Sequence, residues 1–250
     1  MKFTQIQLVL WAAGLVCHVA LLAVLFLRGG YRSFRFFTGW ITYQIALTVA
    51  LYFLHIHSMD RGYSYVYWYG QVLELGLLLG IIWDMVTQVL RPEGKWYYGI
   101  ERPFLYTIVA AVGLALMFTI AIDPYRPATS LKWLYPSNLF CEALMFELGV
   151  GITLTANRFG LAWKNRVWGL STGWLGWSLM ILLVEAARKH WAHSIISDVL
   201  AEVQMYAYLV TICYWMIVFW RKEPERKDMP FDMRAFFSSG IIDLMKGAEK

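Results

Sequence analysis

Seven long apolar stretches constrain this 250-residue chain more than any other feature. Each is close to the roughly 20 residues that cross the hydrocarbon core of a bilayer as a helix. Their apolar residues run continuously, without the alternation of a membrane β-barrel. With 59% hydrophobic and 16% charged residues, the composition is also typical of a polytopic membrane protein. We therefore predict an all-α, seven-helix transmembrane bundle with spans at 5–27, 36–56, 64–90, 104–122, 134–157, 167–187 and 195–220.

The positions of Lys and Arg predict the direction of the bundle. Sixteen of the 22 Lys and Arg lie in the C-terminal tail or in connections on the same side as the tail. Because cytoplasmic connections are enriched in these residues, we expect the N-terminus outside and the C-terminus in the cytoplasm. Residues 1–220 would form the transmembrane domain and 221–250 a cytoplasmic tail. Within the tail, 231–245 predict an amphipathic helix on the inner leaflet, with a loosely ordered tail as the alternative.

The charges inside the apolar stretches are all acidic, and no Lys or Arg lies deep in any of them. A carboxylate near the centre of a span costs on the order of 3 kcal/mol, so such residues are candidates for function. Without a basic partner in the same layer, each must be protonated, hydrogen-bonded or matched by an external cation. The residues concerned are Glu74, Asp84, Glu142, Glu147, Glu185, Asp198 and Glu202.

Most of these carboxylates are expected at one depth, in the outer half of the bundle. Asp84 is an exception, because contact with basic loops at the inner end explains it. An acidic cavity with aromatic neighbours suits an organic cation, through ion pairing and cation–π contact. Protonated carboxylates that hydrogen-bond neighbouring helices are the structural alternative. The predicted ligand-binding residues are Glu74, Gln71, Glu142, Glu147, Glu202, Asp198, Tyr67, Tyr69 and Tyr206, with Trp177 nearby.

No cofactor, metal site or catalytic site is predicted. The last span lacks Lys, so a retinal Schiff base cannot form there, and motifs for nucleotide binding or hydrolysis are missing. The formal charge of +5 reflects orientation in the membrane and does not indicate nucleic-acid binding. An outer zinc site is the alternative to exposed loop histidines, but the spacing is not specific. The histidines concerned are His55, His57, His190 and His193.

Two short patterns predict contacts between helices. Gly76-x-x-x-Gly80 and Gly169-x-x-x-Gly173 allow two backbones to approach closely. Thr38-Gly39-Trp40 and Thr172-Gly173-Trp174 echo each other, and Glu74 lies at a depth similar to that of Glu202. Chance likeness between apolar helices is one explanation of this echo, and a duplication of three plus one plus three helices, as in some small sugar carriers with parallel repeats, would also fit it.

The stretches FRFFTGWITYQ (34–44) and YVYWYGQVLELGLLLGIIWDMVTQVLRP (65–92) resemble an uncharacterised family of bacterial seven-helix integral membrane proteins. The resemblance implies a location in the bacterial inner membrane and implies no activity. The seven-helix plan resembles G-protein-coupled receptors and rhodopsins in architecture only. The family pattern is matched by Tyr65, Tyr67, Trp68, Glu74, Asp84, Arg91 and Pro92.

We therefore expect a receptor-like sensor that binds a small cationic or protonatable ligand in an outer-half cavity. Its partners would be the lipid bilayer, that ligand and a cytoplasmic effector protein. A proton-coupled small-solute transporter, with Glu74 and Glu202 as paired protonation sites, is the alternative. A structural subunit of a membrane complex is a further alternative. An enzyme is not expected, because no nucleophile–base pair stands out.

Overall fold

The computed structural model describes residues 5–57, 59–90, 101–122, 134–155, 165–191 and 195–222, and every element in these ranges is a helix. The all-α prediction is confirmed. Two helices extend beyond the predicted spans because polar residues continue the helix past the apolar run. These are α4 (Asp60–Leu90), at its start, and α7 (Arg166–Trp191), at its end. The elements are α1 (Gln5–Leu27), α2 (Gly30–Ser33), α3 (Arg35–Ile56), α4 (Asp60–Leu90), α5 (Glu101–Ile122), α6 (Leu134–Thr155), α7 (Arg166–Trp191) and α8 (Ile195–Trp220).

Six of these helices, α1, α3, α4, α6, α7 and α8, are long and apolar enough to cross a membrane. In α5 the apolar stretch found, Val109–Ala121, is shorter than a full span. The chain therefore has the helices of a multi-pass membrane protein. The seventh span and the direction of insertion stay predictions from the sequence. The amphipathic helix predicted for 231–245 lies outside the described residues.

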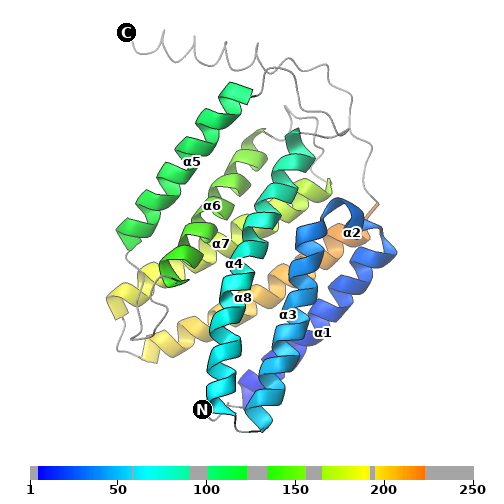
Figure 1. Cartoon of the computed structure of the whole chain (residues 1–250), viewed down its shortest axis with the longest axis vertical. Coiled ribbons are helices and arrows are strands. Elements are labelled where there is room, and N and C mark those ends of the chain that lie inside the picture. The colour runs from blue at the N-terminus through cyan, green and yellow to red at the C-terminus, as the bar shows by residue number, and fades with distance from the viewer. Residues whose placement is uncertain are drawn as a thin grey trace.

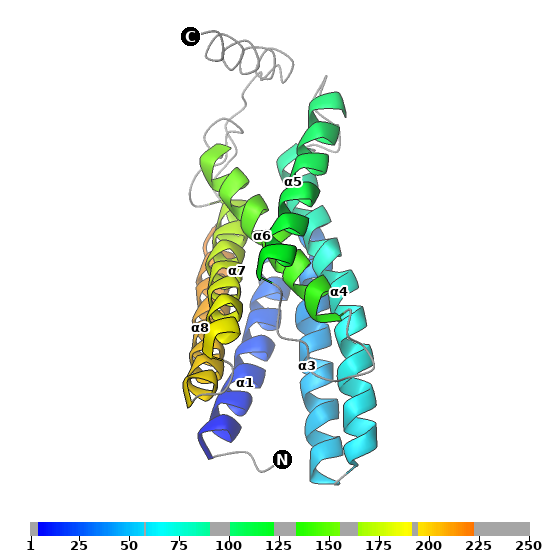
Figure 2. The same cartoon turned by 90° about the vertical axis from the view of Figure 1, so that its left-hand side faces the viewer.

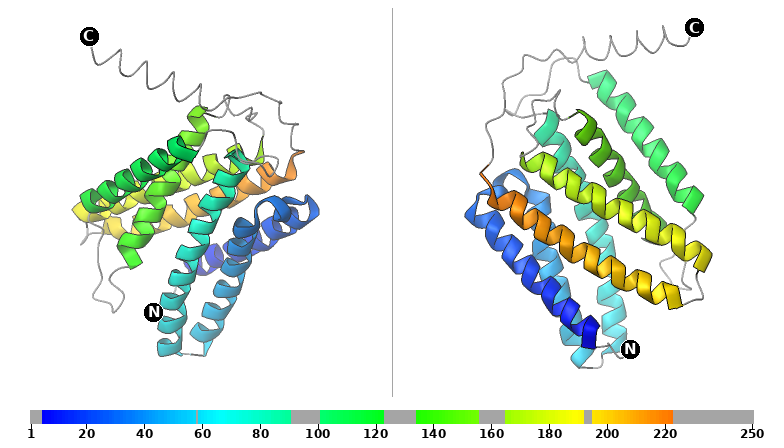
Figure 3. Two further views of the ribbon diagram at one scale, coloured as in Figure 1. Left: turned by 45° about the horizontal axis from the view of Figure 1, so that its top comes forward. Right: turned by 180° about the vertical axis from the view of Figure 1, so that it is seen from behind.

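The six apolar helices form a closed ring. Along it, α1 packs on α3, α3 on α4, α4 on α6, α6 on α7, α7 on α8, and α8 returns to α1. Figure 1 shows α5 at one edge of the bundle beside α6, and Figure 3 shows the same arrangement from behind. Figure 2 shows α3 and α4 to one side of the ring and α7 and α8 to the other. The fifth helix therefore contributes little to the interior.

Aromatic side chains fill the interior toward the end of the bundle at which α1 finishes. Rings of α3, α7 and α8 meet there, with centroid distances of 5.1 Å for Trp174–Trp215 and for Phe37–Trp215. Such pairs contribute about 0.5–1.5 kcal/mol each beyond the burial of their area. We call these rings the aromatic layer. Its members are Phe34, Phe37, Trp40, Trp174, Trp215 and Phe219, all buried.

A tight turn joins α1 to α3. Gly29 has φ 71°, a left-handed conformation that glycine adopts without the steric cost of a side chain. The neighbouring Gly30 lies where an added Cβ would stand 3.0 Å from Leu25 and 3.1 Å from Phe219. The chain can therefore reverse direction against α8, and the short helix α2, which hydropathy does not predict, occupies the turn.

Asp84 of α4 caps the start of α3. Its Oδ2 atom accepts hydrogen bonds from the backbone N–H of Phe36 at 2.7 Å and of Phe37 at 3.3 Å. These N–H groups belong to the first turn, where a helix has no internal acceptors for them. Arg35, one of the basic residues expected at this end of the bundle, also attracts the Asp84 carboxylate, so Asp84 has both a basic neighbour and backbone donors. It ties two helices together through the backbone.

We predict that Asp84→Ala lowers the free energy of unfolding by about 1–3 kcal/mol, because two donors at a buried helix start lose their acceptor. Asp84→Asn keeps one side-chain oxygen and should cost less. Thermal unfolding in nanodiscs measures both variants. Thr87→Ala is the control, since Thr87 bonds the backbone of its own helix. An Asp84→Ala protein as stable as wild type would show that the cap is unimportant.

Glycines of the two small-residue motifs differ in what they face. An added Cβ would meet Phe36 at Gly80, Val218 at Gly169 and the Trp215 indole at Gly173, whereas nothing lies within 4 Å at Gly76. At Gly169 and Gly173 the nearest atoms belong to side chains of α8, so these two glycines make room for Val218 and Trp215 and not for a second backbone. In the α4 motif, only Gly80 makes such a close contact, with α3. Gly70 of α4, outside the motif, also lies close to α3, where an added Cβ would meet Tyr43 and Leu47.

Gly173→Ala should lower the free energy of unfolding by about 1–3 kcal/mol, because the methyl group overpacks a filled site. Gly176→Ala is the matched control on the same helix, since nothing lies within 4 Å of the Cβ it would add. Thermal unfolding of the two variants in nanodiscs compares them. Equal stabilities would mean that Trp215 moves away without cost.

Candidate functional site

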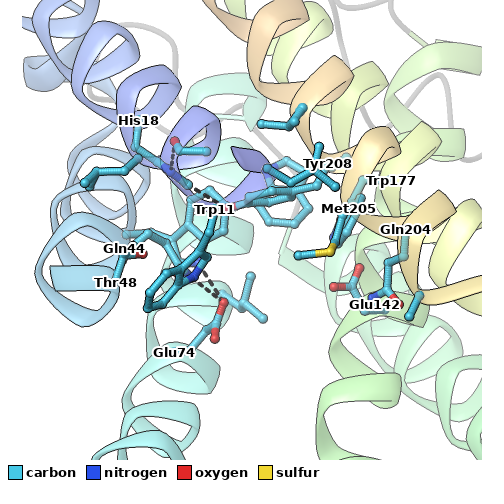
Figure 4. A pocket seen from close by; sticks show the side chains of 18 residues that line it. Trp11, His18, Gln44, Thr48, Glu74, Glu142, Trp177, Gln204, Met205 and Tyr208 are labelled. Atoms are coloured by element: carbon cyan, nitrogen blue, oxygen red, sulfur yellow. Dashed lines mark hydrogen bonds between the residues drawn. The ribbon is translucent and has the colours of Figure 1, made fainter. Parts of the chain in front are cut away.

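A cavity of about 470 Å³ lies inside the ring, between the aromatic layer and the end of the bundle at which α1 begins. All six ring helices contribute to its wall, and none of the described side chains of α2 and α5 does. Its volume falls within the range that holds a small molecule. Figure 4 shows its side chains, which are Leu10, Trp11, Gly14, Leu15, His18, Trp40, Gln44, Thr48, Glu74, Leu78, Glu142, Trp174, Trp177, Ala201, Gln204, Met205, Tyr208 and Leu209.

Three N–H donors hold the carboxylate of Glu74 in this wall. Trp40 Nε1 donates to Oε1 at 3.2 Å, Gln44 Nε2 to Oε1 at 2.5 Å, and Gln71 Nε2 to Oε2 at 3.0 Å. Behind them, Asn138 Nδ2 donates to Gln71 Oε1 at 3.0 Å. Hydrogen bonds to a carboxylate are among the stronger ones in proteins and offset part of its lost hydration. The network also links α3, α4 and α6.

Glu142 of α6, the helix that packs on α4, lines the same cavity as Glu74 (Figure 4). Its Oε2 atom accepts a hydrogen bond from Ser178 Oγ at 2.7 Å, which ties α6 to α7. Among the described residues that line the cavity, none is Lys or Arg. Two carboxylates therefore face one space without a protein cation beside them.

Aromatic rings form much of the remaining wall. Trp40 and Trp174, at centroid distance 5.3 Å, lie where the cavity meets the aromatic layer. Trp177 and Tyr208 form a second pair at 5.1 Å, and Trp11 lies on α1. The faces of such rings carry partial negative charge and attract organic cations. The walls therefore add to the attraction of the two carboxylates.

His18 of α1 and Tyr208 of α8 form a hydrogen-bonded pair in the same cavity. His18 Nδ1 lies 2.7 Å from the Gly14 carbonyl oxygen, which can only accept, so Nδ1 carries a proton. Its Nε2 atom lies 2.8 Å from Tyr208 Oη. In neutral His18, Nε2 therefore accepts a hydrogen bond from the Tyr208 hydroxyl group. Both imidazole nitrogens are engaged, which fixes the orientation of the ring.

The cavity brings together some of the residues predicted from the sequence. Glu74 and Glu142 line it, as does the neighbour Trp177, and Gln71 stands directly behind Glu74. The other predicted residues with described side chains do not line it, and two of them, Tyr69 and Tyr206, are exposed. Those that do not line it are Glu147, Glu202, Tyr67, Tyr69 and Tyr206, and the Asp198 side chain lies outside the described residues.

Eight polar or aromatic lining residues were not predicted. They are single residues in apolar helices, a pattern that ordinary packing also produces. The signal that could have identified them is helical phase, because each lies on the buried face of its own helix. The eight residues are Trp11, His18, Trp40, Gln44, Thr48, Trp174, Gln204 and Tyr208.

Two remaining acidic residues have partners or surroundings of their own. Glu185 accepts a hydrogen bond from Arg188 at 2.6 Å, so the expectation that it lacks a basic partner is wrong. Glu147 has two buried carboxylate oxygens that find no partner in the described part of the chain. The described residues contain no group of three His, Cys, Asp or Glu placed to hold a metal, and the His190 and His193 side chains lie outside them.

Glu74→Gln should lower the free energy of unfolding by about 1–3 kcal/mol, because the new amide sets an N–H against one of the three donors. Rotation of the Gln71 amide would break the hydrogen bond that Gln71 accepts from Asn138. Thermal unfolding in nanodiscs tests this, with Glu202→Gln as the control outside the cavity. A Glu74→Gln protein at least as stable as wild type would show that Glu74 is protonated and acts as structural glue.

The chain matches no family model, no curated protein and no solved structure. Its function therefore has to be inferred from the cavity itself.

Proposed function

We propose that this protein is a receptor-like sensor of the bacterial inner membrane that binds a small organic cation in the cavity. The observation that carries the proposal is the pair Glu74 and Glu142, which face one aromatic-walled space that no described Lys or Arg lines. We assign no catalytic step and no cofactor to this site.

The composition of the cavity supports a cation more than a neutral or anionic ligand. Removal of two carboxylates from water is costly unless donors or an opposite charge compensate them. The hydrogen bonds to Glu74 and Glu142 supply part of that compensation. A bound ammonium group would supply the charge, and each desolvated Trp face would add up to about 2 kcal/mol. Trp40, Trp174 and Trp177 line the cavity.

The shape of the interior supports sensing. The cavity occupies the half of the ring nearer the start of α1, and the buried aromatic layer fills the other half. With the N-terminus outside, as the Lys and Arg distribution predicts, the ligand would come from outside the cell. In this proposal α5 is the seventh span. Residues 1–220 form the membrane domain, and the inner connections and the tail 221–250 contact an effector protein.

Ligand stabilisation in nanodiscs tests the proposal. Choline is the monovalent probe and putrescine the divalent one, and dimethylbutanol is the uncharged isostere of choline. At 100 times its Kd, a probe should raise the free energy of unfolding by about 2.7 kcal/mol. We expect choline, putrescine or both to stabilise wild type, and the uncharged isostere to have no effect.

The carboxylate variants identify the site. Glu74→Gln and Glu142→Gln should each abolish the stabilisation by the probe, and Glu202→Gln should retain it, because Glu202 does not line the cavity. Stabilisation by neither cation, or stabilisation that survives both cavity variants, would overturn the proposal.

A further inference from the structure

The ring divides into two sets of three helices that have the same order and direction. The first set is α1, α3 and α4, and the second is α6, α7 and α8, with α5 between them in the chain and outside the ring. The two sets meet mainly at two interfaces, where α8 packs on α1 and α4 packs on α6, and α4 also makes a smaller contact with α7. If α1 corresponds to α6, α3 to α7 and α4 to α8, one interface maps onto the other. We call these sets the first and second repeats.

The correspondence is exact in sequence position for α3 and α7. Thr38-Gly39-Trp40 coincides with Thr172-Gly173-Trp174 at a shift of 134, the difference between 172 and 38. The two threonines also make the same hydrogen bond. Thr38 Oγ1 donates to the Phe34 carbonyl and Thr172 Oγ1 to the Trp168 carbonyl, each four residues back and each at 2.8 Å. Thr42, Thr87, Thr119 and Thr211 make the same bond four residues back, so the likeness of α3 and α7 is carried by the tripeptide and its position.

The same shift places the buried faces of α4 and α8 in register. Three buried positions of the first helix coincide with three buried positions of the second, although their residue types differ. The shift also pairs Glu74 with Tyr208, and both line the cavity. Glu202, which lies at a depth similar to that of Glu74, is not its counterpart. The buried pairs are Leu78 with Ile212, Ile81 with Trp215, and Met85 with Phe219.

The first helices of the two repeats, α1 and α6, correspond at a shift of 124, the difference between 141 and 17. Leu15-Val16-Cys17 then coincides with Leu139-Phe140-Cys141. The next position holds His18 in one repeat and Glu142 in the other, and both line the cavity. Equivalent positions of all three helix pairs therefore surround one space, which lies between the repeats.

We infer that this protein is a carrier built from two parallel three-helix repeats, and that the cavity is its transport site for a small organic cation. Carriers assembled from repeats bind substrate at the repeat interface and expose it alternately at the two ends as one repeat rocks against the other. The cavity has that position. The inference rests on the proposed cation binding and adds movement through the membrane to it.

The contact between the two tryptophans shows where the path is closed. Trp40 of the first repeat and Trp174 of the second lie at a centroid distance of 5.3 Å and separate the cavity from the rest of the aromatic layer. A path to the other end requires that these two rings, one from each repeat, move apart. Met85 lies beyond them, two turns along α4 from the lining residue Leu78 and on the same face, with 0% exposure.

Counterflow tests the inference directly. Proteoliposomes are loaded with excess unlabelled choline or putrescine and diluted into a trace of the same cation carrying a radiolabel. A carrier accumulates label transiently to severalfold above protein-free vesicles. Glu74→Gln and Glu142→Gln should fall to the protein-free level, and Glu202→Gln should behave as wild type. Binding of a probe without counterflow would overturn the carrier and leave the sensor, whereas neither binding nor counterflow would overturn both.

Thiol accessibility provides a measurement that does not depend on flux. In a chain whose three native cysteines are replaced by serine, Leu78→Cys marks the cavity and Met85→Cys the closed side. A membrane-impermeant thiol reagent should modify Leu78→Cys from the face where α1 begins. Modification of Met85→Cys from the opposite face, at a rate that choline or putrescine changes, is the result expected of a carrier. Complete protection of Met85→Cys from both faces would overturn the inference.

Discussion

Two carboxylates inside an apolar helix bundle need donors from the protein, and the placement of those donors organises the interior. Glu74 is bonded by residues of α3 and α4, and the network continues through Gln71 to Asn138 of α6. Ser178 of α7 does the same for Glu142. Because a buried polar group without a partner costs several kcal/mol, these bonds constrain how four helices meet. The residues that would bind a cation therefore also determine the geometry of their own cavity.

Hydropathy predicted most of the fold because an apolar run of about 20 residues crosses a bilayer as a single helix. It placed the ends of the main helices within a few residues. It did not predict features that depend on how the chain turns or on which helix faces pack together. The turn at Gly29 and the short α2 depend on backbone conformation and on contact with Phe219. The position of α5 outside the ring depends on which helix faces pair, and a continuously apolar sequence does not specify this.

The sequence predicted how deep in the bundle the candidate site lies, but only partly which side chains point into it. Glu74 and Glu142 lie on faces that point into the ring, whereas Tyr69 and Tyr206 occupy neighbouring depths and point outward. Depth follows from counting residues along a span, but direction requires knowledge of which face is buried. Tyr208 lies four residues before the buried Ile212, as Glu74 lies four before the buried Leu78. Comparison of the two helices in this register would have selected Tyr208 in place of Glu202.

In the proposed carrier, divergence between the two repeats would explain how a nearly symmetric frame can hold an asymmetric ligand. Two identical repeats would present like residues in pairs around the cavity. Here the positions of Glu74 and Glu142, at the interface of α4 with α6, correspond to Tyr208 and His18 at the interface of α8 with α1. One side of the cavity is therefore acidic, and the other offers a neutral hydrogen-bonded pair. A ligand with an ammonium group at one end and a polar group at the other would bind in a single orientation. The duplicated frame would supply the movement, and the substitutions within it would supply the recognition.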